Sequence, residues 1–121
     1  PTTRIVVDHI AKPSIRTQEI SEWKKQMKLL AAFPNVYCKV SGMVTEARWP
    51  GWTYEDLVPY LDVVFELFGT DRLMYGSDWP VCLVAATYDE QFSILSEYLR
   101  GFSASEKKGI LGENAKRFYN L

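Results

Sequence analysis

Three short apolar runs, each followed by a segment with helical spacing, most constrain what this chain can fold into. The runs cover residues 5–9, 36–40 and 72–75. Each is short enough for a strand, and residues 5–9 are apolar enough to be buried on both faces of a parallel sheet. The alternation of strand and helix predicts an α/β protein with right-handed crossovers, either an open doubly wound sheet or part of a barrel.

The segments between the runs carry signals for the starts and ends of helices. We expect helices from Ile20 to about Phe33, from Thr53 to Phe68, from Tyr88 to Leu99, from Ser103 onward and over residues 114–119. Thr53 with Asp56, and Ser103 with Glu106, have the spacing of N-terminal capping pairs, and Gly69 is placed to stop the second helix. Residues 43–52 show no period and predict a loop.

Composition excludes several classes of partner. Lys and Arg total 14 against 15 Asp and Glu, for a net charge of −1, which argues against a nucleic-acid or acidic-membrane partner. No apolar stretch approaches the roughly 20 residues that cross a bilayer. The two cysteines, Cys38 and Cys82, form no C-x-x-C pair, so a reduced, cytoplasmic setting is expected. Because residues 5–9 need neighbours on both sides, the chain is expected to begin partway through a larger fold.

Side-chain alternation in the second run separates two faces of the sheet. One set is apolar and should meet the helices: Val36, Cys38 and Val40. The other set suits the interior of a barrel: Tyr37, Lys39 and Ser41. The same alternation groups Ile5 and Val7 with His9, and Met74 and Gly76 with Asp78. If both groups point inward, His9 and Asp78 lie at the carboxyl ends of strands, where barrel enzymes keep catalytic groups.

Four segments also carry recognisable motifs. They are Asp8-His-Ile-Ala-Lys-Pro13, Cys38-Lys-Val-Ser-Gly42, Tyr75-Gly-Ser-Asp-Trp-Pro-Val-Cys82 and Leu111-Gly-x-Asn-Ala-x-x-x-Tyr119. In this order they resemble the amidohydrolase superfamily, of the amidohydrolase-2 type, and its branch of lactone hydrolases similar to L-fuconolactonase. The resemblance implies a metal-dependent-hydrolase-like (β/α)8 TIM barrel. Residues 1–121 would be the C-terminal part of this single domain, supplying about the last three βα units plus the C-terminal helices.

The resemblance further implies a hydrolase that opens a lactone, a carboxylic ester ring of a sugar acid, by base-assisted attack of water. Asp78 matches the aspartate at the end of strand eight, which is the general base and, in members that bind metal, a metal ligand. His9 matches the histidine at the end of strand six, which would ligate the metal or donate a hydrogen bond to the oxyanion. The family's histidine pair on strand one and its strand-five residues have no counterpart here.

A divalent metal such as zinc is therefore one expectation, and a metal-independent reaction is the other. A catalytic zinc usually takes three protein ligands, and His9 and Asp78 supply at most two. We expect weak or no metal affinity for this segment by itself.

Four further residues are candidates for the substrate site. Ser41 and Trp79, at strand ends, are expected to line the pocket. Lys39 is expected to neutralise buried carboxylates, Asp78 among them, ahead of contacting substrate. Lys12 is a candidate substrate contact, with a solvated loop lysine as the alternative.

One alternative to a hydrolase remains open, and a second is disfavoured. The first is a non-catalytic, truncated fragment or orphan half-barrel that self-associates, since open strand edges invite pairing. The second, a flavodoxin-like domain, would need a phosphate-binding glycine loop after the first strand, and residues 10–13 do not provide one. In the hydrolase interpretation the partner is a small-molecule lactone. The 121-residue chain alone is expected to be inactive and either poorly soluble or a homo-oligomer.

Overall fold

The computed structural model describes residues 3–121 and places three parallel strands in one sheet. The strands are β1 (Ile5–Val7), β2 (Val36–Val40) and β3 (Leu73–Tyr75), in the order β1-β2-β3. Val7 pairs with Cys38, and Cys38 pairs in turn with Leu73. The predicted α/β fold with a parallel sheet is confirmed.

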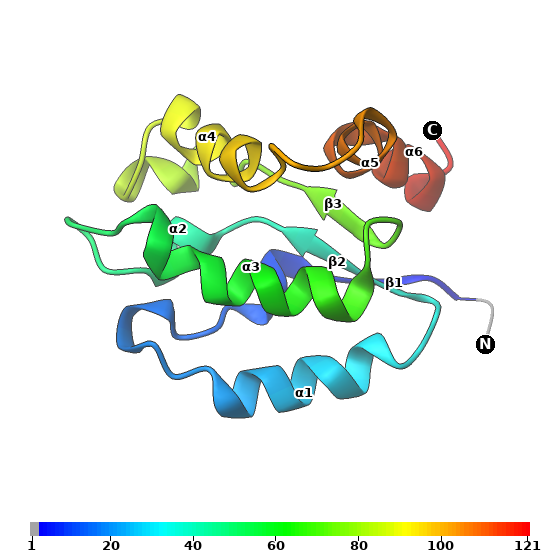
Figure 1. Cartoon of the computed structure of the whole chain (residues 1–121), viewed down its shortest axis with the longest axis horizontal. Coiled ribbons are helices and arrows are strands. Elements are labelled where there is room, and N and C mark those ends of the chain that lie inside the picture. The colour runs from blue at the N-terminus through cyan, green and yellow to red at the C-terminus, as the bar shows by residue number, and fades with distance from the viewer. Residues whose placement is uncertain (1–2) are drawn as a thin grey trace.

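Helices pack beside this sheet (Figure 1). The longer ones are α1 (Ser21–Ala31), α3 (Tyr54–Phe68) and α4 (Tyr88–Tyr98); the shorter ones are η1 (Asp8–Ala11), η2 (Ile15–Thr17), α2 (Met43–Glu46), η3 (Val81–Val84), α5 (Ala104–Lys108), the π-helical turn η4 (Gly109–Glu113) and α6 (Asn114–Tyr119). In the view of Figure 1, α3 lies in front of the strands, α1 below them, and α4 to α6 above. The expectation of an irregular loop at residues 43–52 was wrong in part, since α2 occupies its first four residues.

Local capping fixes where the main helices begin and end. Thr53 and Asp56 form the predicted reciprocal pair at α3, and Ser103 and Glu106 do so at α5. A third pair, which the sequence analysis did not identify, joins Thr87 and Glu90 at α4. Each pair satisfies two backbone N–H groups that the first turn of a helix leaves without a partner.

The two faces of β2 differ as the alternation predicted. Val36, Cys38 and Val40 are buried in the main hydrophobic core, together with Leu57 and Leu61 of α3 and Leu73 of β3. Lys39 and Tyr37 lie on the opposite face and are partly exposed. The register places Met74 beside Lys39, and Met74 is buried outside the main core. The polar residues at the strand ends therefore belong to the face opposite the main core.

Arg72, just before β3, joins the ends of α1 and α3. Its guanidinium donates hydrogen bonds to four backbone carbonyls, those of Ala31, Phe33, Val36 and Leu67, at 2.9–3.4 Å. It also lies 5.2 Å from the ring centroid of Phe68. The carbonyls of a helix C-terminus have no partner within the helix, and Arg72 supplies one to each of these two helices.

Candidate active site at the carboxyl ends of the strands

A left-handed turn places His9 in the site. The first strand ends at Val7, and residues 9–12 all have positive φ, between 46° and 63°. Left-handed geometry costs about 1–2 kcal/mol per residue other than glycine, so tertiary contacts must hold this turn. Ile10 is fully buried, and the indole of Trp23 donates a 2.8 Å hydrogen bond to its carbonyl.

This turn corrects the expectation that Ile5, Val7 and His9 share a face. Val7 packs against the main core, on the side of its partner Cys38. His9 instead contacts Ser41, which follows β2 and lies on the face of Lys39. Strand alternation ends at Val7, and the left-handed turn carries the imidazole across to the other face.

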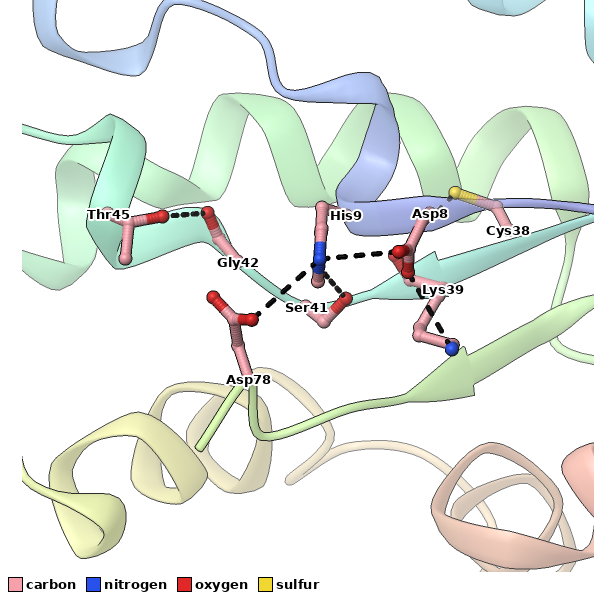
Figure 2. Close-up of polar contacts among 8 residues, drawn as sticks. All are labelled: Asp8, His9, Cys38, Lys39, Ser41, Gly42, Thr45 and Asp78. Atoms are coloured by element: carbon pink, nitrogen blue, oxygen red, sulfur yellow. Dashed lines mark hydrogen bonds and ion pairs between the residues drawn. The ribbon is translucent and has the colours of Figure 1, made fainter. Parts of the chain in front are cut away.

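Three side chains meet the His9 ring (Figure 2). Nδ1 lies 2.8 Å from Ser41 Oγ, while Nε2 lies 3.3 Å from Asp8 Oδ2 and 3.7 Å from Asp78 Oδ1. The predicted approach of His9 to Asp78 is therefore present. The exposed fractions of the two side chains are 24% and 14%, so both are accessible yet largely shielded from solvent.

Asp78 reaches His9 from the segment that follows β3. Its φ is 58°, and its carbonyl accepts a hydrogen bond from the N–H of Cys82. Two residues earlier, Gly76 leaves room for the neighbouring strand. A Cβ at that position would lie 3.0 Å from Ser41 Cβ and 3.2 Å from Lys39 Cδ. Gly76 therefore lets the polar side chains of β2 pack beside the segment that carries Asp78.

Asp8 is a site residue that the sequence analysis did not single out. Its Oδ1 lies 3.6 Å from Lys39 Nζ, and its other oxygen contacts His9. The expectation that Lys39 neutralises a carboxylate holds for Asp8, which is 60% exposed, and not for Asp78, which is 14% exposed. The only signal in the sequence was its position directly before His9.

Lys12 and Trp79 lie at the same end of the sheet, but both are exposed. Within residues 3–121, no hydrogen bond or ion pair joins either side chain to His9 or Asp78. Their contacts with substrate stay predictions.

The two cysteines are poor nucleophiles in this environment. Burial raises the pKa of the Cys38 thiol to about 12, and the nearby Asp8 charge adds to the shift. Burial also raises the pKa of Cys82, with a further contribution from Asp78. A thiol attacks as its thiolate, so neither cysteine offers a nucleophile near neutral pH.

The chain matches a known family over its whole length. The family model for amidohydrolases covers residues 1–121. The chain belongs to the amidohydrolase family. Among curated relatives, it is 41% identical to L-fucono-1,5-lactonase of Burkholderia multivorans, in an alignment that covers 97% of this chain and 43% of the relative. It is 26% identical to L-rhamnono-gamma-lactonase of Scheffersomyces stipitis, over 100% of this chain and 42% of the relative.

Solved structures of amidohydrolases have the same fold. An amidohydrolase from Burkholderia multivorans with bound zinc is 41% identical and superimposes with a TM-score of 0.92 over 98% of this chain and 44% of that one. The fold is therefore part of an amidohydrolase (β/α)8 barrel. The chain spans about 43% of the length of the first-named lactonase, and corresponds to a C-terminal portion.

The described residues do not form a complete metal site. Imidazole and carboxylate groups such as those of His9, Asp8 and Asp78 are suitable zinc ligands. Within residues 3–121, however, no three His, Cys, Asp or Glu side chains are arranged to hold an ion. These residues could therefore supply only part of a zinc site.

Among the helices of residues 3–121, none is both long enough and apolar enough to span a bilayer.

Proposed function

We propose that this chain supplies the last three βα units of a lactone hydrolase, as the C-terminal part of one barrel domain. The proposed substrate is a sugar-acid lactone, a class suggested by the names of the two lactonase relatives. The charge balance and the two free thiols favour a cytoplasmic enzyme. The remaining strands would supply the rest of the site, so the 121-residue chain alone is expected to be inactive.

In this proposal Asp78 is the general base. Its carboxylate takes a proton from water as the water oxygen attacks the lactone carbonyl. The Nε2–H of His9 donates a hydrogen bond to the oxygen on which negative charge develops. When the tetrahedral intermediate collapses, the ring C–O bond breaks and Asp78 returns the proton to the departing oxygen. The product is a hydroxy acid, and one water has been consumed.

The observation that carries this proposal is the approach of His9 and Asp78. Their side chains lie 3.7 Å apart at the carboxyl ends of β1 and β3, on the face opposite the main core. A proton acceptor and a hydrogen-bond donor are thus side by side at the end of the barrel where its enzymes carry out chemistry.

The test is lactone hydrolysis by the complete barrel polypeptide, followed by acid release against a panel of sugar-acid lactones. Loss of a general base is expected to lower kcat by about 10²–10⁴-fold, so Asp78→Asn should be nearly inactive. Asp89→Asn, at an exposed position on α4, is the matched control and should retain full activity. Equal activity of Asp78→Asn and the parent would remove Asp78 from the mechanism, and inactivity of the parent toward every lactone would reject the substrate class.

A further inference from the structure

We propose that Ser41 and Gly42 position the imidazole of His9, and that Ser41 acts on His9 and not on the substrate. The catalytic consequence rests on the proposed function, but the positioning itself does not. Both residues follow β2, the central strand, and lie beside the His9 side chain (Figure 2).

Ser41 is placed to hold the ring and not to bind a ligand. Its exposed fraction is 1%, and its hydroxyl oxygen lies 2.8 Å from Nδ1 of His9. The backbone around it is fixed, because the N–H of Gly76 donates a 3.0 Å hydrogen bond to the carbonyl of Val40. A buried hydroxyl without a hydrogen-bond partner is destabilising, so the contact with His9 is strongly preferred.

The backbone of Gly42 packs closely against the side chain of His9. A Cβ at this residue would lie 2.9 Å from each of three His9 atoms, Cβ, Cγ and Nδ1, which is closer than real contacts allow. Its φ of 64° also favours glycine. The hydroxyl of Thr45 donates a 2.9 Å hydrogen bond to the Gly42 carbonyl and holds this backbone in place. The imidazole therefore lies directly against the main chain and has little freedom to turn.

The partners of the ring also determine which nitrogen carries the proton. Nε2 faces the carboxylates of Asp8 and Asp78, which accept but cannot donate when ionised. The proton of the neutral ring is therefore assigned to Nε2, which leaves Nδ1 as an acceptor. Ser41 satisfies Nδ1 by donating its hydroxyl proton. By this contact Ser41 holds the tautomer that directs an N–H toward the site.

Nitrogen NMR of the complete barrel polypeptide, labelled with ¹⁵N-histidine, tests the positioning without any substrate. The His9 signals are identified by their loss in His9→Gln, and are recorded at a pH where the ring is neutral. We expect an acceptor-type Nδ1 and a protonated Nε2 in the parent. Ser41→Ala should give shifts averaged between the two tautomers, and Gly42→Ala should displace both signals. Ser93→Ala, which removes an exposed hydroxyl on α4, should leave them unchanged.

Kinetics of the same variants separate positioning from substrate contact. We expect Ser41→Ala to lower kcat by about 10–100-fold with KM changed less than about threefold, because a misplaced ring weakens the reaction step more than binding. A rise in KM with kcat and the His9 signals unchanged would overturn the proposal in favour of substrate contact. Parent-like His9 signals in both Ser41→Ala and Gly42→Ala would also overturn it. Ser41→Cys, which keeps a small side chain but is a weak donor, replaces Ser41→Ala if that variant does not fold. If the parent itself hydrolyses no lactone, the NMR result still decides the positioning.

Discussion

Asp8 and Asp78 share one imidazole nitrogen, and their surroundings assign them different roles. Asp8 is the nearer of the two to Nε2, at 3.3 Å against 3.7 Å, but it is 60% exposed and is paired with Lys39. Water and a cation therefore offset most of its negative charge. Asp78 is 14% exposed and has no lysine or arginine within ion-pair distance in residues 3–121. In the proposed mechanism Asp78 is therefore the better-placed base, and Asp8 would help to orient the ring.

We predict that Asp8→Asn lowers kcat of the complete polypeptide by less than about fivefold, because an exposed ion pair contributes about 0.2–1 kcal/mol. The measurement is the same acid-release assay, run beside Asp78→Asn. Lys39→Met removes the same Asp8–Lys39 pair from the other side and should have a similarly small effect. A loss from Asp8→Asn as large as that from Asp78→Asn would make Asp8 the base and refute the assignment above.

For single residues, the sequence predicts which residues form the site better than it predicts the face to which their side chains point. Motif resemblance was enough to select His9 and Asp78, and the structure brings them together. Asp8 was missed because strand alternation would place it on the face opposite to His9. That rule stops at Val7, where the left-handed turn begins, and nothing local in Ile10-Ala11 signals positive φ. The buried contacts of Ile10 and Trp23 hold the turn, and these join parts of the chain 13 residues apart.

At the scale of helices and strands, Arg72 is the most connected side chain of the described residues. It bonds to carbonyls from the C-terminal ends of α1 and α3 and from the start of β2. Hydrogen bonds that involve a charged group contribute about 1.5–3 kcal/mol each to stability, and bonds that share one side chain do not simply add. The ends of two βα units are thus held by one guanidinium.

In the complete barrel polypeptide, replacing Arg72 by Met is therefore expected to lower the free energy of unfolding by about 2–4 kcal/mol. The substitution leaves several part-buried carbonyls without a hydrogen-bond donor. Arg72→Lys should recover less than half of this loss, because an ammonium cannot span the same set of carbonyls. Urea denaturation followed by circular dichroism measures both. The control is Arg100→Met, whose side chain is 75% exposed and, among the described residues, pairs with Glu97 alone; its cost should stay below about 1 kcal/mol. Equal costs at positions 72 and 100 would contradict the bridging role.

Helix boundaries were predictable where the signal is local. The capping pairs at Thr53 and Ser103 lie within three residues of their partners, and both are confirmed. The first helix ends at Ala31, two residues before the predicted end near Phe33. The bridging role of Arg72 could not be predicted, because most of its partners are backbone carbonyls 36–41 residues away, and backbone groups leave no trace in sequence composition.

For the molecule as a whole, the outer strands β1 and β3 each pair on one side only within residues 3–121. Beside β1, an apolar pocket is formed by Ile5, Leu30, Phe33, Asn35 and Val36. Ile5 is 51% and Phe33 57% exposed. An exposed strand edge next to apolar side chains favours association with another chain.

The 121-residue chain is accordingly predicted to self-associate. Phe33→Glu should shift it toward monomer, because the introduced charge would have to be buried at the interface. Size-exclusion chromatography with light scattering measures the mass of the parent and of the variant. Leu121→Glu alters an apolar residue that is 90% exposed and lies outside the pocket, and should leave the mass unchanged. A monomeric parent, or equal effects of both variants, would exclude association through this pocket.

The contacts of His9 have one more consequence, because they draw on the ends of all three strands. Ser41 follows β2 and lies 32 residues from His9 in sequence, and Asp78 follows β3. If either neighbouring strand paired one residue out of step, its side chains would exchange faces and the imidazole would lose that partner. The contacts of this chain's single histidine therefore depend on correct strand register. The surroundings of its imidazole distinguish a correctly paired sheet from a compact sheet whose strands are out of register.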